Sequence, residues 1–302
     1  MKKVFIDGSA GTTGLRIFDR LDNRDDIELI TLPEELRKDS AARKCAINMS
    51  DVSFFCLPDS ASVEAAGFVE NPDTVIIDTS TAHRTNDGWT YGFPELSGYR
   101  EKIRHSKRIA NPGCHASGFI ALVQPLVSAG LIAKDAALSC FSLTGYSGGG
   151  KKMIASYEDG NCPEQLSSPG MYGLSQAHKH LPEMQKICFL ENAPSFCPVV
   201  APYYSGMQVT VPLFKTDINS VCEVYSNTYK TGLIHFNGIV NEGTLYAADL
   251  KNKDIMEVVV CGNSDRLLLV SRFDNLGKGA SGAAIQNMNI VLGCKEDKGL
   301  SV

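Results

Sequence analysis

Short apolar runs recur through the first part of the chain, separated by stretches whose apolar residues fall at helical spacing. Runs that are apolar throughout are typical of parallel strands with both faces covered, and alternation of such strands with helices indicates a doubly wound parallel sheet. The predicted strands are residues 3–7, 27–32, 52–57, 74–78 and 107–110.

Beyond about residue 115 the runs alternate apolar and polar positions, as strands with one covered face do. A helix is predicted over 220–232, ended by Gly232, and a last helix with small residues at its start over 277–293. This half is therefore predicted to be an α+β domain with a mixed or antiparallel sheet, whose strands include 205–211, 256–262 and 266–273.

Length and composition narrow the class of protein. The chain has 302 residues, more than one hydrophobic core usually holds, so two domains are expected. A formal charge of −5 with scattered basic residues gives no footprint for nucleic acid, and no apolar run is long enough to cross a membrane. The start, MKKVFIDG, fits a first strand better than an export signal, so we expect a cytoplasmic protein. Ten cysteines without a C-x-x-C pair indicate free thiols and no metal site.

A glycine-rich turn joins the first predicted strand to an amphipathic stretch in which Leu15, Phe18 and Leu21 share a face. Glycines at such a turn let the backbone approach a pyrophosphate and present it to a helix N-terminus. Ala10 replaces the middle glycine of the usual fingerprint, but the strand and helix context is present, which favours a Rossmann-like dinucleotide site over an empty tight turn. The residues assigned to this site are Gly8, Gly11, Thr12, Thr13 and Gly14.

The segment after the second strand bears on the choice of nicotinamide cofactor. Arg37 and Lys38 could bind a 2′-phosphate, whereas Glu34 and Glu35 could bind a free ribose hydroxyl. We favour NADP and NADPH, and we leave the alternative open.

Cys114 follows a Pro-Gly turn and precedes a helical pattern, unlike cysteines that lie in apolar runs, such as Cys140. Partial positive charge at a helix N-terminus favours the thiolate, and His115 could add to it. Such a thiolate can attack a carbonyl, lose hydride to a nicotinamide and leave a thioester that phosphate cleaves. Run backwards, the same chemistry reduces an acyl phosphate to an aldehyde.

An acid or base must accompany that thiol, and His178 and His180 are the candidates. On a strand or a helix, side chains two residues apart point to different sides, so we expect only one of the two to face the site. Glu183 could orient His180, which slightly favours that residue.

Two segments offer donors to an anionic substrate. The first follows the fourth strand, at a carboxyl end where open α/β sheets bind ligands, and contains Ser80, His83 and Arg84. The second is the loop 145–152, whose successive glycines could form a backbone nest with Ser147, Gly148 and Gly149. We assign Ser80 to the cofactor, and the other residues, with Asn111, to the substrate.

Six segments in order from residue 5 to residue 293 resemble the short bacterial type of N-acetyl-gamma-glutamyl-phosphate reductase. They are FIDGSAGTTGLRI, DTSTAHRTNDGWTYGFPEL, NPGCHASG, GYSGGGKKMI, HKHLPEM and NLGKGASGAAIQNMNIVLG. The resemblance implies NADPH-dependent reduction of N-acetyl-glutamyl 5-phosphate to the semialdehyde in arginine biosynthesis. It also implies that Cys114 is the nucleophile, that the HKH segment supplies the acid/base and that the STAHR segment contacts substrate.

The same resemblance implies a semialdehyde-dehydrogenase-like division of the chain. Residues 1–114 would bind the dinucleotide, completed by a C-terminal helix in 276–302, and residues 115–275 would carry catalysis, substrate and oligomerisation. Asn275 could then reach the cofactor amide. A homo-oligomer, dimer or tetramer, is implied as well.

Three other readings of the same residues stay open. An aspartate-semialdehyde dehydrogenase would share the glycine loop and Cys114 but bind a different substrate. A cysteine-dependent amidase or hydrolase would need the thiol and a histidine without a nicotinamide. A dinucleotide sensor would leave Cys114 without a catalytic role.

Overall fold

The computed structural model describes residues 1–160 and 162–302 and divides them into two compact units. The first unit is Met1–Pro94, Gly98–Pro112 and Ala280–Leu300; the second is Glu95–Ser97, Gly113–Gly279 and Ser301–Val302. Within the described ranges, no helix is both long and apolar enough to span a membrane.

The first unit is built on a parallel sheet of six strands in the order β2-β1-β3-β4-β6-β5. This confirms the predicted doubly wound sheet, since the order reverses direction between β1 and β3. The short strand β5 was not predicted, because two residues carry no periodic signal. The strands are β1 (Lys2–Asp7), β2 (Ile27–Ile30), β3 (Val52–Phe55), β4 (Val75–Asp78), β5 (Thr90–Tyr91) and β6 (Arg108–Ala110).

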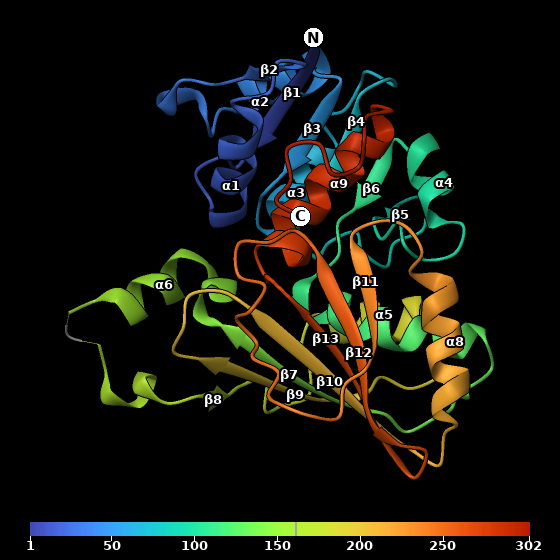
Figure 1. The fold of residues 1–302 in the computed structure, drawn as a ribbon. Helices are drawn as coiled ribbons and strands as arrows, with labels where there is room; N and C mark the ends of the chain where they lie inside the picture. The colour runs from blue at the N-terminus through green and yellow to red at the C-terminus, as the bar shows by residue number, and fades with distance from the viewer. Residues whose placement is uncertain (161) are drawn as a thin grey trace. The chain divides into compact units, whose positions relative to one another are not determined.

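Helices cover both faces of this sheet because successive strand residues point to opposite sides. On one face, Val4 and Ile6 of β1 pack in a core with residues of α1, α4 and α9; on the other, Phe5 packs with residues of α2 and α3. Figure 1 shows α9, from the far end of the sequence, lying among the elements of this first unit. The helices are α1 (Thr12–Leu21), α2 (Ser40–Met49), α3 (Asp59–Ala66), α4 (Tyr99–His105) and α9 (Gly282–Val291), with a short 3₁₀ turn, η1 (Glu34–Leu36).

The buried face of α1 differs from the predicted one. Leu15 is 44% exposed, whereas Ile17 and Leu21 are buried against the sheet. The prediction placed Leu15 on one face with Phe18 and Leu21, but the face that turns toward the preceding loop is the one with Gly14. A Cβ at Gly14 would lie 2.4 Å from the Gly8 carbonyl oxygen, so this close approach fixes how the helix is rotated.

The second unit contains a mixed sheet of seven strands in the order β11-β12-β13-β10-β7-β9-β8, which confirms the predicted α+β character. The centre, β12-β13-β10-β7, is antiparallel, and the β7–β9 and β11–β12 pairs are parallel. The strands are β7 (Ser139–Gly145), β8 (Gly170–Met171), β9 (Ser195–Ala201), β10 (Met207–Phe214), β11 (Ile234–Ile239), β12 (Met256–Asn263) and β13 (Arg266–Phe273).

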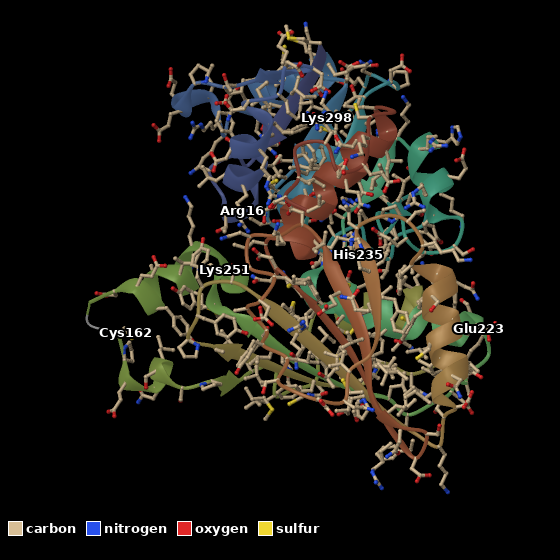
Figure 2. The ribbon with its side chains drawn as sticks, viewed as in Figure 1. Arg16, Cys162, Glu223, His235, Lys251 and Lys298 are labelled. Carbon is tan, nitrogen blue, oxygen red and sulfur yellow. The ribbon has the colours of Figure 1, made fainter. Side chains whose placement is uncertain are left out.

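Helix α5 packs on β10 and β13, and α7 and α8 pack beside it. On α8, Val221 and Tyr225 are buried, while Glu223 is exposed and labelled in Figure 2. This helix ends at Thr228, so the prediction that Gly232 ends it is wrong; Gly232 has a φ of 102° in the loop beyond. The helices are α5 (Cys114–Ser128), α6 (Gly150–Glu158), α7 (Leu181–Ile187) and α8 (Ile218–Thr228), with 3₁₀ turns η2 (Tyr146–Gly149) and η3 (Glu164–Ser167) and a π-helix, η4 (Gly277–Ser281).

Helix α5 contains Pro125 and nevertheless continues to Ser128. A proline has no N–H, so the carbonyl of Ala121, four residues earlier, loses its helical donor. The hydroxyl of Tyr229 donates to that carbonyl, and the hydroxyl of Tyr225 donates to the carbonyl of Leu122. The chain segment around α8 therefore supplies the hydrogen bond that the sequence of α5 lacks.

Candidate active site

The glycine turn of the first unit lies between β1 and α1 and is shaped by its backbone. Gly8 has a φ of +88°, and a Cβ there would lie 2.3 Å from the carbonyl oxygen of Cys56. Gly11 is the N-cap of α1, with no side-chain cap and no acidic residue in the first turn. The N–H groups of Thr12 and Thr13 thus begin a helix without a carboxylate competitor, as a pyrophosphate site requires.

The four charged residues that bear on cofactor choice lie together. Glu34 and Glu35 are in η1, Arg37 ends that turn, and Lys38 follows it; all four are exposed. The next residue, Asp39, caps α2 by accepting the N–H of Ala42 at 2.7 Å. Figure 2 labels a further basic residue, Arg16 on α1, that the sequence analysis did not single out.

Ser80 and His83 are tied to Asp78, the buried last residue of β4. The Asp78 carboxylate accepts the N–H and the hydroxyl of Ser80 at 2.9 and 2.7 Å, and Nδ1 of His83 lies 2.7 Å from it. The His83 ring stacks on Trp89, with 4.0 Å between ring centroids. This network, which the sequence motif did not reveal, holds the loop after β4 in a defined shape.

Arg84 and Asn111 are both buried in the first unit. Arg84 donates from Nε to the carbonyl of Asn111 and from a terminal nitrogen to the carbonyl of Thr79, each at 3.0 Å. Asn111 donates to the carbonyl of Ala280 at 3.0 Å. The guanidinium thus joins the segments that follow β4 and β6, which places it at the carboxyl ends of these strands.

In the second unit, Cys114 is the first residue of α5 and is half-buried. Its N-cap is Gly113, which is extended and has no side chain to occupy the first-turn N–H groups. The helix has no acidic residue in its first turn and runs for 15 residues. Such a terminus favours the thiolate over the thiol.

The imidazoles of His178 and His180 lie side by side, with ring centroids 4.8 Å apart. The prediction that they point to different sides is therefore wrong. Both residues precede α7 in a turn, where neither strand alternation nor helical rotation applies, and the His180 N–H donates to Nδ1 of His178 at 3.2 Å. The His115 ring lies 5.6 Å from His178 and 5.5 Å from His180, so the three imidazoles form one cluster.

Glu183 connects this cluster to the start of α5. One of its carboxylate oxygens lies 3.9 Å from Nε2 of His180, and the other accepts the N–H of Gly113 at 3.2 Å. Both side chains are buried. Burial lowers the pKa of His178, with Lys179 as a second cause, so this imidazole is neutral near pH 7. Of the two histidines, His180 is the one placed beside a carboxylate.

His115 is a neutral member of the cluster. Its Nδ1 lies 2.7 Å from the Ser142 hydroxyl and its Nε2 lies 2.6 Å from the Tyr172 hydroxyl. Complete burial lowers its pKa to about 3, with His178 as a second cause. The prediction that His115 adds positive charge beside Cys114 is therefore wrong, because the imidazole is uncharged at neutral pH.

Tyr172 was missed by the sequence analysis. Its pKa is raised, first by burial and then by the charge of Cys114, so the phenol lies within electrostatic reach of the thiol. Tyr172 follows the two-residue strand β8, and its N–H donates to Pro198. Such an edge position carries no motif, and only the fold brings it to the cluster.

Asn275 and Ser147 form a buried pair in the second unit. Asn275 donates to the Ser147 hydroxyl at 3.0 Å and accepts the N–H of Gly206 at 2.9 Å. Gly148 and Gly149 follow in η2 and are exposed. The pair therefore fixes the base of the glycine loop, and the glycines present their backbone to solvent.

Two family models match the chain. Residues 3–106 match the semialdehyde dehydrogenase NAD binding domain, and residues 114–275 match the semialdehyde dehydrogenase dimerisation domain. An aspartate semialdehyde dehydrogenase II from Vibrio cholerae, complexed with ASA, has the same fold, with a TM-score of 0.73 at 17% identity over 97% of this chain and 98% of that one. A Candida albicans aspartate semialdehyde dehydrogenase with NADP gives a TM-score of 0.67 at 16% identity, over 97% and 98%. Fold and models together define an oxidoreductase of the semialdehyde dehydrogenase class.

Curated relatives narrow this class. The N-acetyl-gamma-glutamyl-phosphate reductase 2 of Nostoc sp. is 41% identical over 318 residues, covering 99% of each chain. The N-acetyl-gamma-glutamyl-phosphate reductase of Brucella ovis is 43% identical over 306 residues, covering 96% of this chain and 99% of the relative. The chain belongs to the N-acetyl-gamma-glutamyl-phosphate reductase family.

Proposed function

We propose that this protein reduces N-acetyl-L-glutamyl 5-phosphate to N-acetyl-L-glutamate 5-semialdehyde with NADPH, releasing phosphate, as a step of arginine biosynthesis. The names of relatives at 41% and 43% identity support the substrate. The observation that carries the chemistry is the position of Cys114 at a helix N-terminus that has no side-chain cap. The N–H of the N-cap residue, Gly113, donates to Glu183, and Glu183 lies beside His180.

In this proposal the Cys114 thiolate attacks the acyl carbonyl, the carbon–oxygen bond to phosphate breaks, and a thioester remains on the sulfur. A nicotinamide cofactor, held by the glycine turn of the first unit, would supply the hydride needed to bring this thioester to the aldehyde level. His180 takes the proton of the thiol before attack, and Glu183 stabilises the resulting imidazolium. Collapse of the reduced adduct breaks its carbon–sulfur bond, which releases the aldehyde and restores the thiolate.

The residues of the first unit fit a dinucleotide. At Gly8 and Gly14 a side chain would collide with the backbone, so these glycines let β1, the turn and α1 pack closely together, as a dinucleotide-binding turn requires. Thr12 and Thr13 would offer backbone N–H groups to the pyrophosphate. We propose Arg37 and Lys38 as the contacts of the 2′-phosphate, because both are exposed cations in the segment that follows β2. Ser80 and Asn275 would shape the cofactor site through the networks they hold.

We propose that the anionic substrate is bound by Arg84 and His83, with Asn111 orienting the guanidinium. Arg84 already has donors fixed on backbone carbonyls, so its charge is held in place before substrate arrives. The backbone of Ser147, Gly148 and Gly149 would receive a second group of the substrate.

A homo-oligomer is part of the proposal, because the domain model of the second unit describes a dimerisation domain. Two large apolar side chains of the second sheet are exposed: Phe141 by 43% and Leu268 by 45%. They pair with Thr210 and Pro212, two residues apart on β10, and therefore lie on the same face of the sheet. Covering these side chains with a second copy would remove apolar surface from water. We therefore propose a dimer or tetramer in the cytoplasm, where the substrates of a biosynthetic enzyme are dissolved.

The test is the reverse reaction, with N-acetylglutamate semialdehyde, NADP and phosphate, followed by the absorbance of the reduced cofactor. We expect phosphate-dependent reduction with this substrate and none with aspartate semialdehyde. Turnover of aspartate semialdehyde alone would reassign the substrate, and no turnover with either would overturn the reductase proposal. NADPH binding without turnover would indicate a dinucleotide sensor. Hydrolysis of an amide in the absence of NADPH would indicate a cysteine hydrolase.

A further inference from the structure

A buried ion pair in the second unit has no place in the mechanism above. Nζ of Lys278 lies 2.7 Å from an oxygen of Glu95, and the two side chains are 2% and 0% exposed. The same oxygen of Glu95 accepts the N–H of Leu233 at 3.2 Å. Both charges have thus been taken fully out of water.

Stability does not explain such a pair. The cost of desolvating two charges roughly cancels their attraction, so an uncharged pair of similar volume would hold the fold as well or better. A retained buried pair is better explained by what it keeps in place. Lys278 belongs to the π-helix η4, and π-helices are rare and are frequently found at functional sites.

The π-helix lies directly on the reactive cysteine. A Cβ built at Gly279 would be 3.0 Å from Cβ of Cys114 and 3.1 Å from the ring of Phe273, so any side chain here would press on the thiol residue. Lys278 is the residue immediately before this glycine. A shift of Lys278 therefore moves the surface against which the Cys114 side chain rests.

Asp274 holds the other end of the same turn. Its backbone carbonyl accepts the N–H groups of Gly277 and Gly279, each at 3.0 Å. Its carboxylate accepts the N–H of Leu276 at 2.8 Å and that of Asn252 at 2.7 Å. The turn is thus anchored by Asp274 at its start and by the Lys278–Glu95 pair one residue before the glycine that contacts Cys114.

We propose that Lys278 is a positioning residue for the reduction: paired with Glu95, it holds Gly279 against Cys114 and so fixes the direction from which the thiolate attacks. The inference rests on the proposed function, since it assumes that Cys114 is the nucleophile. A displacement of about 1 Å at a reacting atom lowers a rate by roughly 100-fold, so a buried pair can be kept for geometry alone.

The experiment replaces both charges at once, with Lys278→Met and Glu95→Gln in one chain. Glutamine keeps an acceptor for the Leu233 N–H, and methionine fills most of the lysine volume. The matched control is Arg272→Met, which removes a mostly buried guanidinium from its pairing with Glu257 and Asp249 in the same unit. For each protein we would measure kcat, KM for the acyl phosphate, the Kd for NADPH, the thermal midpoint and the pH-dependent rate at which iodoacetamide alkylates Cys114, quantified on its own peptide.

We expect the double variant to keep its NADPH Kd and to keep its KM within about twofold, with kcat reduced about 10- to 100-fold. The plateau rate of Cys114 alkylation at high pH should change, because access to the sulfur changes even when all of it is thiolate. A folded double variant with parental kcat and parental alkylation would overturn the proposal. Equal losses in Arg272→Met would overturn it too, since they would show a general effect of losing a buried charge.

If the double variant does not fold, Glu95→Asp carries the test, because it keeps both buried charges and shortens by one methylene the side chain that holds Lys278. Its kcat should fall while the alkylation plateau of Cys114 shifts, and parental values of both would overturn the proposal. Failure of the proposed function is distinguishable: the unaltered protein would then not reduce NADP, while the alkylation plateau would still report whether the pair controls the geometry of Cys114.

Discussion

Helices α1 and α5 begin alike and are suited to different tasks. Both have an extended glycine as N-cap, Gly11 and Gly113, with no side-chain cap and no acidic residue in the first turn. Helices α2 and α8, by contrast, begin with Asp39 and Asp217, whose carboxylates accept a first-turn N–H. An uncapped N-terminus leaves its positive end for another anion, which we propose is a pyrophosphate at α1 and the Cys114 thiolate at α5.

What separates the two termini is the residue that follows the glycine and the residues that surround it. At α1 the threonines add no nucleophile, and glycines keep side chains away. At α5 a cysteine follows, and Glu183 accepts the N–H of Gly113 while lying near His180. We therefore propose that the same backbone feature binds a ligand at α1, which has no acidic side chain in its first turn, and supports a reactive cysteine at α5, where Glu183 lies beside it.

The largest expected effect comes from changing Cys114 at α5, the residue proposed as the nucleophile. Cys114→Ser should lower kcat by at least about 10³-fold, because a hydroxyl is far less ionised than a thiol at neutral pH. The Kd for NADPH, measured by the fluorescence of the reduced cofactor, should be unchanged, since that task is proposed for α1. Cys45→Ser, at an exposed cysteine, is the control and should behave as the parent. Preserved turnover in Cys114→Ser would remove the thiol from the mechanism.

The reciprocal change gives α1 the cap that α2 has. Gly11→Asp should raise the Kd for NADPH about 10-fold or more, because a carboxylate would occupy the first-turn N–H groups and repel the pyrophosphate. The backbone allows this side chain, since φ is −74° and a Cβ would lie 3.4 Å from its nearest neighbour, the carbonyl oxygen of Gly8.

Gly11→Ala adds the same Cβ without the charge and serves as the control. Equal weakening of NADPH binding by Ala and Asp would mean that space at Gly11, rather than the positive end of α1, governs affinity. Alkylation of Cys114 should be parental in both variants.

The comparison also shows which features could be predicted from the sequence. The strands of the parallel sheet, the glycine turn and the start of α5 depend on local pattern, and the sequence carries that pattern. The cluster around Cys114 depends on chain reversals instead. Tyr172 and Ser142 reach His115 only because β8, β9 and β7 are neighbours in one sheet, and the paired imidazoles of His178 and His180 depend on a turn that periodicity does not describe.

Titration should distinguish the two helix starts, because only α5 has a buried histidine in its first turn. The pKa of His115 is about 3 in the folded protein against 6.5 ordinarily, so the unfolded chain binds a proton that the folded protein does not between these values. The free energy of unfolding should therefore fall as pH drops below about 6.5, by roughly 2 kcal/mol at pH 5 from this residue.

His115→Gln keeps an amide to bond Ser142 and Tyr172 but has no proton to bind. Urea unfolding between pH 7 and pH 5 should show a shallower loss of stability in this variant than in the parent. Parallel pH dependences in the two proteins would show that His115 does not resist protonation as its burial implies.

The smallest expected effect concerns the interior of α5. Tyr229→Phe removes the hydroxyl that donates to the Ala121 carbonyl, which Pro125 leaves without a helical donor. We expect the free energy of unfolding to fall by about 1–2 kcal/mol, because that carbonyl is buried. In a Pro125→Ala background the backbone N–H is restored, so the same tyrosine change should cost less; a double-mutant cycle in urea measures the difference. An equal cost in both backgrounds would mean that Tyr229 stabilises α5 through packing, and that the helix behind Cys114 tolerates its proline without outside help.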